Sequence, residues 1–127
     1  MVENDTRTGE AAARPLLKIK LGGGDDLARL EAVRNAAPDA RLIVDANEAW
    51  TPQQYAAMAP AFAQLGVALI EQPLPAAADA ALADLPHPVP VCADESCHDR
   101  HGLADLARRY DAINVKLDKT EIGRAHV

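Results

Sequence analysis

The sequence is short of aromatic residues, of cysteines and of positive charge, and each shortage excludes a class of function. Aromatic residues make up 3% of the 127 residues, and the net charge at pH 7 is -6. Proteins that bind nucleic acids present a basic surface, often with interleaved aromatic side chains, and the sequence shows neither feature. We therefore expect no nucleic-acid partner.

The sequence also lacks a long apolar run and the pattern of a secretory signal. No run approaches the ~20 apolar residues of a membrane-spanning helix. The polar start MVENDTRTGE has no apolar segment of the kind found in signal peptides. Cys92 and Cys97 are the only cysteines, and Cys92 lies in an apolar run where a small core residue is expected. These features predict a cytoplasmic protein without a membrane partner, and they leave its oligomeric state open.

Apolar runs that carry charged residues near their ends recur along the chain. They are LLKIKL, RLIVDAN, VALIEQP, VPVCADES and AINVKLDK, separated by helix-like stretches. This alternation predicts an α/β fold with parallel strands, either a small doubly wound domain or part of a (β/α)8 barrel. Because a complete barrel needs ~250 residues, we expect a partial TIM-type barrel of consecutive βα units, one for each run, without the last strands.

The chain divides into three predicted parts. Residues 1–15 are polar and then alanine-rich, and we expect them to be disordered or to end a preceding helix. Residues 16–120 form the barrel domain, with helices expected at about 26–37, 51–65, 76–85 and from Ser96 or His98 to Tyr110. Residues 121–127 read EIGRAHV, which a widely used sequencing adapter encodes in one reading frame, so we expect a non-native tail.

Acidic residues stand at the ends of three consecutive predicted strands, as Asp45, Glu71 and Asp94. Adjacent strands lie about 4.8 Å apart, so carboxylates at neighbouring strand ends can bind a single ion. Ligand sets made only of oxygen favour Mg²⁺ or Mn²⁺ over zinc. Alternatively, each acid is a helix N-cap or lies at a solvated strand end. This alternative accounts well for a single acid, but less well for three acids at corresponding positions of neighbouring strands.

Lysines lie inside the apolar runs on either side of these acids. Lys20 and Lys116 flank the acidic strands, and Lys18 is on the same side of its strand as Lys20. A lysine acts as a base where burial or a neighbouring cation favours its neutral form, so Lys20 and Lys116 are candidate bases. The alternative, exposed lysines whose stems cover apolar surface, does not explain their place within apolar runs. Secondary candidates at the same strand ends are Asn47, Glu95 and Asp118.

Two weaker patterns have structural explanations. The run Gly22-Gly23-Gly24 is expected to be a tight turn, since Asp25 and Asp26 would repel a phosphate and the P-loop pattern is absent. One of these two aspartates is expected to cap the following helix. The core, or packing between helices, is expected to contain Trp50, Tyr55 and Phe62.

The strings LKIKLGG, IVDANEAW, IEQPLP, CADESCHDR and INVKLDKT together resemble the enolase superfamily, in its muconate-lactonising branch. Within that branch they are most similar to the dipeptide epimerases of the L-Ala-D/L-Glu type. The strings span residues 16–120, and the order KxK, DAN, EQP and DES is specific for the branch.

The resemblance implies a Mg²⁺-dependent 1,1-proton transfer on a dipeptide. It implies that the metal ligands are Asp45, Glu71 and Asp94. It also implies that Lys20 and Lys116 are acid/base residues on opposite faces of the substrate α-carbon, with Lys18 assisting Lys20. One lysine removes the α-proton, the metal stabilises the resulting enediolate, and the other lysine protonates the opposite face.

The sequence departs from the family pattern in ways that affect activity. The family has a capping domain before the barrel and further strands after it, both of which contact substrate, and KTEIG stands where KTGG is expected. We therefore expect this chain alone to be inactive. A cycloisomerase, an o-succinylbenzoate synthase, and a non-catalytic fragment or small module that binds Mg²⁺ or a partner stay open as alternatives.

Overall fold

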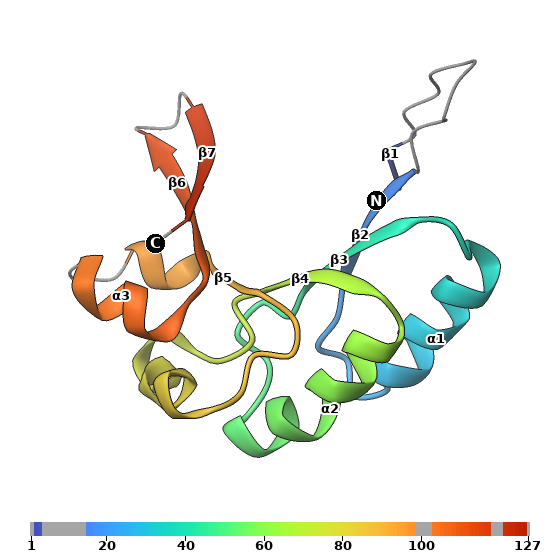
Figure 1. Ribbon diagram of the computed structural model, residues 1–127, viewed down its shortest axis with the longest axis horizontal. Helices are drawn as coiled ribbons and strands as arrows, with labels where there is room; N and C mark the ends of the chain where they lie inside the picture. Colours follow the sequence, from blue (N-terminus) through green and yellow to red (C-terminus); the bar gives the residue numbers. More distant parts are fainter. Residues whose placement is uncertain (1, 4–14, 99–102, 118–120, 127) are drawn as a thin grey trace.

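The structure, a computed structural model, describes residues 2–3, 15–98, 103–117 and 121–126. Its centre is a series of parallel strands in chain order, which confirms the predicted arc of βα units (Figure 1). The parallel strands are β2 (Leu16–Lys20), β3 (Arg41–Asp45), β4 (Val67–Glu71), β5 (Val91–Ala93) and β6 (Ala112–Leu117). The sheet is therefore the part of a barrel wall that the sequence pattern predicts.

Two antiparallel strands, which the sequence pattern did not predict, extend the sheet at its edges. They are β1 (Val2–Glu3), which pairs with β2, and β7 (Glu121–His126), which pairs with β6. Parts of the predicted leader and of the predicted tail thus belong to the sheet. The rest of these two segments, residues 1, 4–14 and 127, lies outside the described residues.

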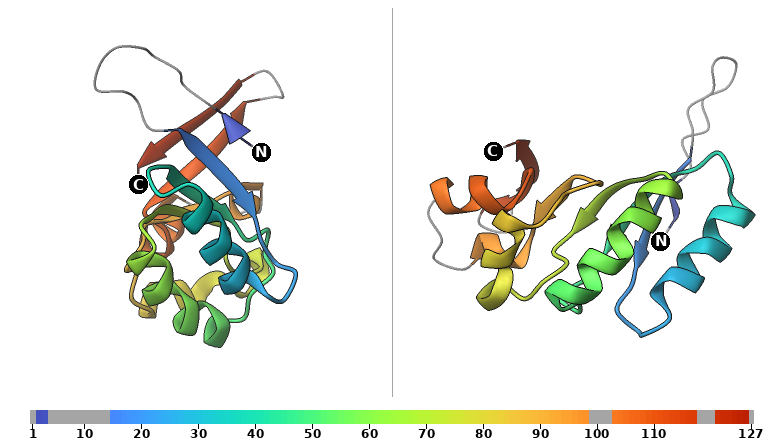
Figure 2. Two further views of the ribbon diagram at one scale, coloured as in Figure 1. Left: turned by 90° about the vertical axis from the view of Figure 1, so that its right-hand side faces the viewer. Right: turned by 60° about the horizontal axis from the view of Figure 1, so that its bottom comes forward.

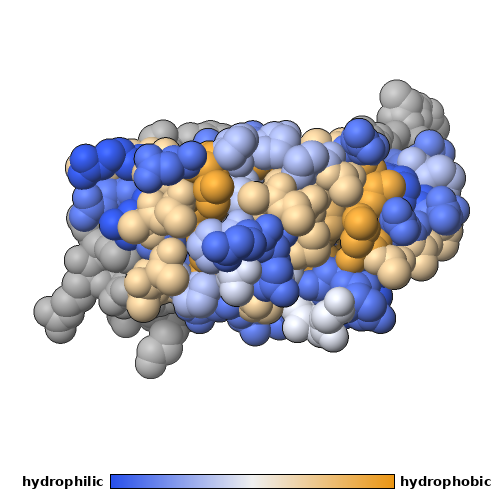
Figure 3. Space-filling view, turned by 90° about the horizontal axis from the view of Figure 1, so that it is seen from below, coloured by the Kyte–Doolittle hydropathy of each residue, from blue (hydrophilic) through white to orange (hydrophobic). Residues whose placement is uncertain are grey.

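The helices cover one side of the strands. They are α1 (Asp26–Ala36), α2 (Pro52–Gln64), the 3-10 helices η1 (Ala76–Asp84) and η2 (Glu95–His98), and α3 (Leu103–Arg109). Helices α1 and α2 lie side by side below the strands in Figure 1, and the tilted view in Figure 2 shows the same arrangement. Seen from below, this side of the molecule is a mosaic of hydrophilic and hydrophobic residues (Figure 3). None of the helices in the described residues is both long and apolar enough to cross a membrane.

Helix α2 begins as the sequence predicts. The Thr51 hydroxyl accepts the backbone N–H of Gln54 at 3.1 Å, and the Gln54 side chain accepts the backbone N–H of Thr51 at 2.9 Å. This reciprocal capping, followed by Pro52 in the first turn, satisfies backbone donors that a helix start leaves unpaired. The helix continues without a break through Pro60.

Two of the predicted helices differ in the structure. The segment expected as an α-helix at 76–85 is the 3-10 helix η1, with Ala78 N–H bonded to the Pro75 carbonyl at 2.9 Å. Residues three apart share a face in a 3-10 helix, and this geometry buries both Asp79 and Leu82. Where a helix is expected from Ser96 or His98 to Tyr110, the described residues form the 3-10 helix η2 and the α-helix α3, and residues 99–102 lie outside the described part. Ser96, in η2, bonds to the side chains of Gln72 and Asp79.

The core lies between the strands and the helices. Leu42, Val44 and Ile70 of the sheet are fully buried, as are Leu30 of α1 and Phe62 of α2. Each such side chain contributes about 1.5–3 kcal/mol through removal of apolar surface from water. Successive side chains of a strand point to opposite faces of the sheet. The strand residues next to these buried ones therefore point away from the helices, to the concave face of the arc.

The aromatic residues predicted for the core are buried there. The rings of Trp50 and Phe62 lie edge to face, with centroids 5.5 Å apart, and Tyr55 is 1% exposed. Cys92 is also fully buried, which confirms the prediction of a small core residue.

Candidate metal centre

The strand register aligns the predicted site residues at the carboxyl end of the sheet. Lys20 pairs with Asp45, Asp45 pairs with Glu71, and Glu71 pairs with Cys92. Asp94 follows Cys92 by two residues, just beyond the short strand β5. Parallel strands expose their carboxyl ends at one edge, and the acids therefore meet there.

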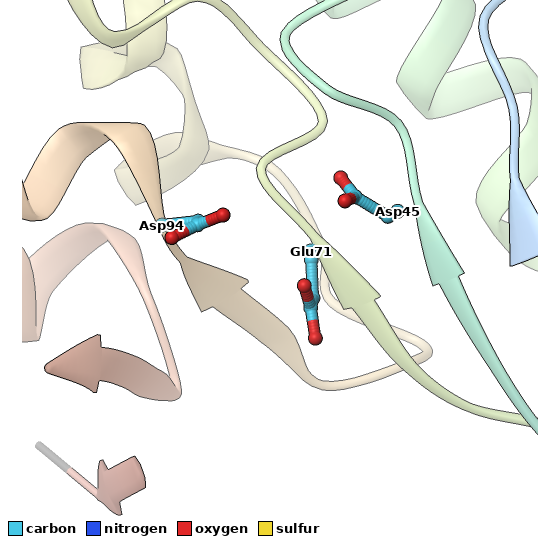
Figure 4. Close-up of side chains that lie close together, drawn as sticks. All are labelled: Asp45, Glu71 and Asp94. Carbon is cyan, nitrogen blue, oxygen red and sulfur yellow. The ribbon is translucent and has the colours of Figure 1, made fainter. Parts of the chain in front are cut away.

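Asp45, Glu71 and Asp94 each offer a carboxylate oxygen within 4.8 Å of the others. Figure 4 shows the side chains of Asp45 and Asp94 turned toward each other, with Glu71 between them on β4. Asp45 and Glu71 are buried, and Asp94 is half-buried. Three negative charges at this spacing repel one another in a site of reduced polarity, so the cluster favours a bound cation.

Two observations support the fit of a divalent cation to this cluster. The Lys18 ammonium already lies 3.2 Å from Glu71 Oε1, so the site accommodates positive charge. Octahedral Mg²⁺ holds ligands at about 2.1 Å, which places them roughly 3–4 Å from one another. Small side-chain adjustments from the observed spacing would reach that geometry. The all-oxygen donor set matches Mg²⁺ or Mn²⁺, as the sequence predicts.

Glu95 adds a further carboxylate beside the cluster. Its Oε1 is buried without a hydrogen-bond partner among the described residues. Burial raises the pKa of Glu95, and the nearby charges of Asp94, Glu48 and Asp45 raise it further. Glu95 thus increases the negative potential that a cation at the cluster would relieve.

The lysines differ in their relation to the acids. Lys18 contacts Glu71 with a side chain that is 41% exposed, whereas Lys20, at the end of β2, is exposed. Lys116 lies in β6, but its side chain falls outside the described part of the structure. Asp118 lies outside the described residues altogether.

The loop after β3 contacts the cluster through its backbone. The N–H of Asn47 donates to Asp45 Oδ1 at 3.0 Å, while the Asn47 residue is exposed. Glu48, which the sequence did not single out, accepts the N–H of Ala76 at 2.8 Å and so connects this loop to the loop after β4. Asn47 and Glu48 both have positive φ, at 54° and 67°. Such backbone strain is typical of loops at functional sites.

The loop after β2 is connected to the same region by Asp26. Its Oδ1 accepts the N–H groups of Gly22 and Gly23 at 2.8 and 3.1 Å, and its Oδ2 accepts the Trp50 indole N–H at 2.7 Å. Gly22 has φ +118°, and a Cβ there would lie 2.9 Å from the Cβ of Ala49, so the turn requires glycine. The expected aspartate cap of α1 is therefore wrong in detail. Asp25 is the N-cap residue but makes no side-chain cap bond, and the side chain of Asp26 binds the turn instead.

Sequence reasoning missed the largest buried polar side chain beside the acids, Gln72. It is fully buried and lies directly after Glu71. The only sequence signal is its position within the string EQP, which does not reveal its partners. Its side-chain partners Ser96 and Tyr110 lie in η2 and directly after α3, in other parts of the chain.

Comparison with known proteins assigns this architecture to a family. The Enolase C-terminal domain-like family matches residues 6–123. The chain is 52% identical over 117 residues to an L-Ala-D/L-Glu epimerase of Escherichia coli K12, covering 92% of this chain and 36% of that protein. It is 49% identical over 106 residues to an N-acetyl-D-glutamate racemase of a Pseudoalteromonas species, covering 84% of this chain and 34% of that protein.

A solved structure shows the same likeness. It is an enolase family member from Agrobacterium tumefaciens with homology to dipeptide epimerases, with bound sodium and L-Ala-L-Glu. The identity is 59% and the TM-score 0.76, over 83% of this chain and 32% of the other. The chain therefore spans about a third of the length of the relatives that it matches.

Proposed function

Because this chain belongs to the Enolase C-terminal domain-like family, we propose that the complete protein is a divalent-cation-dependent epimerase of dipeptides of the L-Ala-D/L-Glu type. The observation that carries this proposal is the cluster of Asp45, Glu71 and Asp94, whose carboxylate oxygens lie within 4.8 Å of one another. The cluster lies at the strand ends, in register with a lysine-bearing strand.

The three carboxylates would hold Mg²⁺. When bound, the cation supplies positive charge that binds a substrate carboxylate and stabilises the negative charge that develops as the α-proton leaves. The burial of Asp45 and Glu71 strengthens this electrostatic effect, because water screens charges less in a partly desolvated site.

The lysines would carry the proton. In one direction Nζ of Lys20 takes the α-proton from one face of the substrate, and the ammonium of Lys116 donates a proton to the opposite face. One C–H bond breaks and another forms, so the product is the epimer and no other atom is exchanged. Lys18, on the same side of β2 as Lys20, would place a second positive charge beside it.

The relatives' substrates share one chemical feature. L-Ala-D/L-Glu and N-acetyl-D-glutamate both contain glutamate with an acylated nitrogen and a free α-carboxylate. We propose the same feature for the substrate of this protein. The free carboxylate would bind the cation, and the acyl group would distinguish dipeptide from acetylated substrate.

The test is an epimerisation assay of the complete protein with L-Ala-D-Glu, L-Ala-L-Glu and both enantiomers of N-acetylglutamate. Turnover of the dipeptides that is lost in EDTA and restored by Mg²⁺ is expected. Lactonisation or dehydration of other carboxylates, without epimerisation, would support a cycloisomerase or an o-succinylbenzoate synthase instead. The present chain alone is expected to be inactive, because it spans only about a third of its relatives and would not exclude water or orient a substrate.

A further inference from the structure

The side chain of Gln72 reaches the turn that carries Asp94. It is fully buried, and its Oε1 accepts the backbone N–H of Asp94 at 2.8 Å and of Ser96 at 3.0 Å. A backbone N–H can only donate, so the amide oxygen must face this turn. Gln72 therefore fixes the backbone from which the Asp94 carboxylate projects.

The other end of the amide faces three acceptors. Nε2 lies 2.8 Å from the Leu74 carbonyl, 2.9 Å from Ser96 Oγ and 2.8 Å from the Tyr110 hydroxyl. The Gln72 carbonyl also accepts the N–H of Glu48 at 2.9 Å. Gln72 thus connects the loops after β3, β4 and β5, which are the strands whose ends supply the acidic cluster.

Asp79 and Arg109 complete the network at its far side. Asp79 is fully buried and accepts the Tyr110 hydroxyl at 2.6 Å, the Ser96 hydroxyl, and the Arg109 guanidinium at 2.7 Å. Because a carboxylate only accepts, both hydroxyls donate to Asp79 and present lone pairs to the Gln72 amide. Burial raises the pKa of Tyr110, and its hydrogen bond to Asp79 raises it further, so the phenol keeps its proton. Each donor and acceptor is therefore oriented by the next.

We propose that this network, Gln72–Ser96–Tyr110–Asp79–Arg109, positions Asp94 toward Glu71 and Asp45 for cation binding. Gln72 is the positioning residue, since its Oε1 accepts the backbone N–H of Asp94. The inference rests on the proposed cation site.

Two features explain why Asp94 needs such support. Strand β5 has only three residues, so few hydrogen bonds between strands hold the backbone that precedes Asp94. Gln72 has φ +39°, an unfavourable conformation for a residue with a side chain, and its hydrogen bonds hold it there. A residue kept in this conformation beside a metal ligand is typical of a site whose geometry is fixed before the ligand binds.

The experiment compares two buried tyrosines by measuring Mn²⁺ binding to the purified chain by electron paramagnetic resonance. Tyr110→Phe removes a hydroxyl of the network. Tyr55→Phe is the matched control, because Tyr55 is 1% exposed and donates one hydrogen bond, to the Pro86 carbonyl at 2.9 Å. Both variants are expected to unfold at lower temperature than the wild type. Only Tyr110→Phe is expected to raise the Mn²⁺ Kd, by about 10-fold or more.

A second readout separates positioning from general stability. Water proton relaxation counts the water ligands of bound Mn²⁺, and we expect at least one additional water in Tyr110→Phe and in Gln72→Met, where Asp94 no longer reaches the ion. Equal Mn²⁺ affinity and equal water count in the Tyr110 and Tyr55 variants would overturn the proposal. If Tyr110→Phe does not fold, Ser96→Ala, which removes another hydroxyl of the network, takes its place in the same comparison.

The cation site itself is checked with Asp94→Asn. If the wild type does not bind Mn²⁺, the cation site is wrong and the positioning network falls with it. If the wild type binds and Asp94→Asn does not, while Tyr110→Phe binds as the wild type does, only the positioning network is wrong.

Discussion

The ammonium of Lys18 lies 3.2 Å from Oε1 of Glu71, a carboxylate that is fully buried while the lysine side chain is 41% exposed. A buried carboxylate without positive charge nearby is costly, and the half-exposed lysine offsets that cost without being buried itself. Lys18 thus supplies positive charge at the same carboxylate that is proposed to bind the divalent cation.

This arrangement predicts that Lys18→Met destabilises the cation-free protein. Loss of the charged partner of Glu71 is expected to lower the free energy of unfolding by about 1–3 kcal/mol. Saturating Mn²⁺ should remove most of that difference, because the cation then offsets the same charge. Lys20→Met is the control, since Lys20 is exposed at the next position on that face of β2. Urea unfolding with and without Mn²⁺ measures both, and an equal loss in the two variants would contradict the prediction.

Asp94→Asn is expected to weaken divalent-cation binding severely and, in the complete protein, to abolish turnover. The substitution removes one of the three negative charges of the cluster while keeping the shape of the side chain. Titration calorimetry with Mg²⁺ or Mn²⁺ measures the loss. Asp84→Asn, which removes an exposed charge from η1, should bind as the wild type does. Full activity of Asp94→Asn in the presence of a chelator would refute the metal assignment.

Asp26 is expected to make stability depend on pH. Burial alone would raise the pKa of this carboxyl, but the donors Gly22, Trp50 and Gly23 and the charge of Arg29 outweigh it, so the pKa lies below 3.8. A carboxyl with a lowered folded-state pKa stabilises the fold above its unfolded value and loses that effect as pH falls through the folded value.

Asp26→Asn should therefore cost about 1–3 kcal/mol of unfolding free energy at pH 7, and the difference from the wild type should shrink below pH 3.8. Urea unfolding measured between neutral and acid pH gives the two curves. Asp25→Asn is the control, because Asp25 is exposed and makes no side-chain cap bond. A difference from the wild type that does not change with pH would show that the charge of Asp26 is not responsible.

Arg34 stabilises the opposite end of the sheet, away from the acids. Its guanidinium donates to the carbonyls of Leu65 at 2.7 Å, Ala40 at 2.8 Å and Ala37 at 3.1 Å, and so holds the ends of α1 and α2 together. Arg34→Lys cannot reproduce these forked contacts. We expect it to lower the melting temperature and to leave the Mn²⁺ affinity unchanged, while Arg41→Lys, at an exposed position, changes neither. A weaker Mn²⁺ affinity in Arg34→Lys would show that the two ends are coupled.

The sequence predicts the parallel strands, helices α1 and α2 and the acids because each depends on local pattern. The apolar runs define the strands, Thr51-Pro52 defines the start of α2, and strand ends on one edge bring Asp45 and Glu71 together. The partners of Gln72 are not predictable in this way. They lie 24 and 38 residues away along the chain, at Ser96 and Tyr110, and their contacts depend on how whole loops pack.

The form of η1 could not be predicted for a related reason. Its alanine-rich sequence suits an α-helix, but burying Asp79 and Leu82 on one face favours the 3-10 form. Local propensity is weaker than tertiary packing in a segment of this length.

Lys20 and Lys116 are proposed as the two bases of the complete protein. Lys20 lies on β2 and Lys116 on β6, on either side of the strands that carry the acids. An α-carbon bound at the cation would then lie between them. Removing one lysine should stop epimerisation, because the product face cannot be protonated. It should spare exchange of the α-proton with solvent in the one epimer that the remaining lysine deprotonates.

The experiment incubates Lys20→Ala and Lys116→Ala separately with each epimer in heavy water, and mass spectrometry follows deuterium at the α-carbon. Opposite exchange preferences of the two variants are the expected result, since each retains the base for a different face. Lys119→Ala, three residues after Lys116, is the control and should epimerise normally. If each face has its own base, each variant must lose a different half of the reaction. Lys20 and Lys116 are therefore not the two bases if both variants still interconvert the epimers, or if both exchange the same epimer.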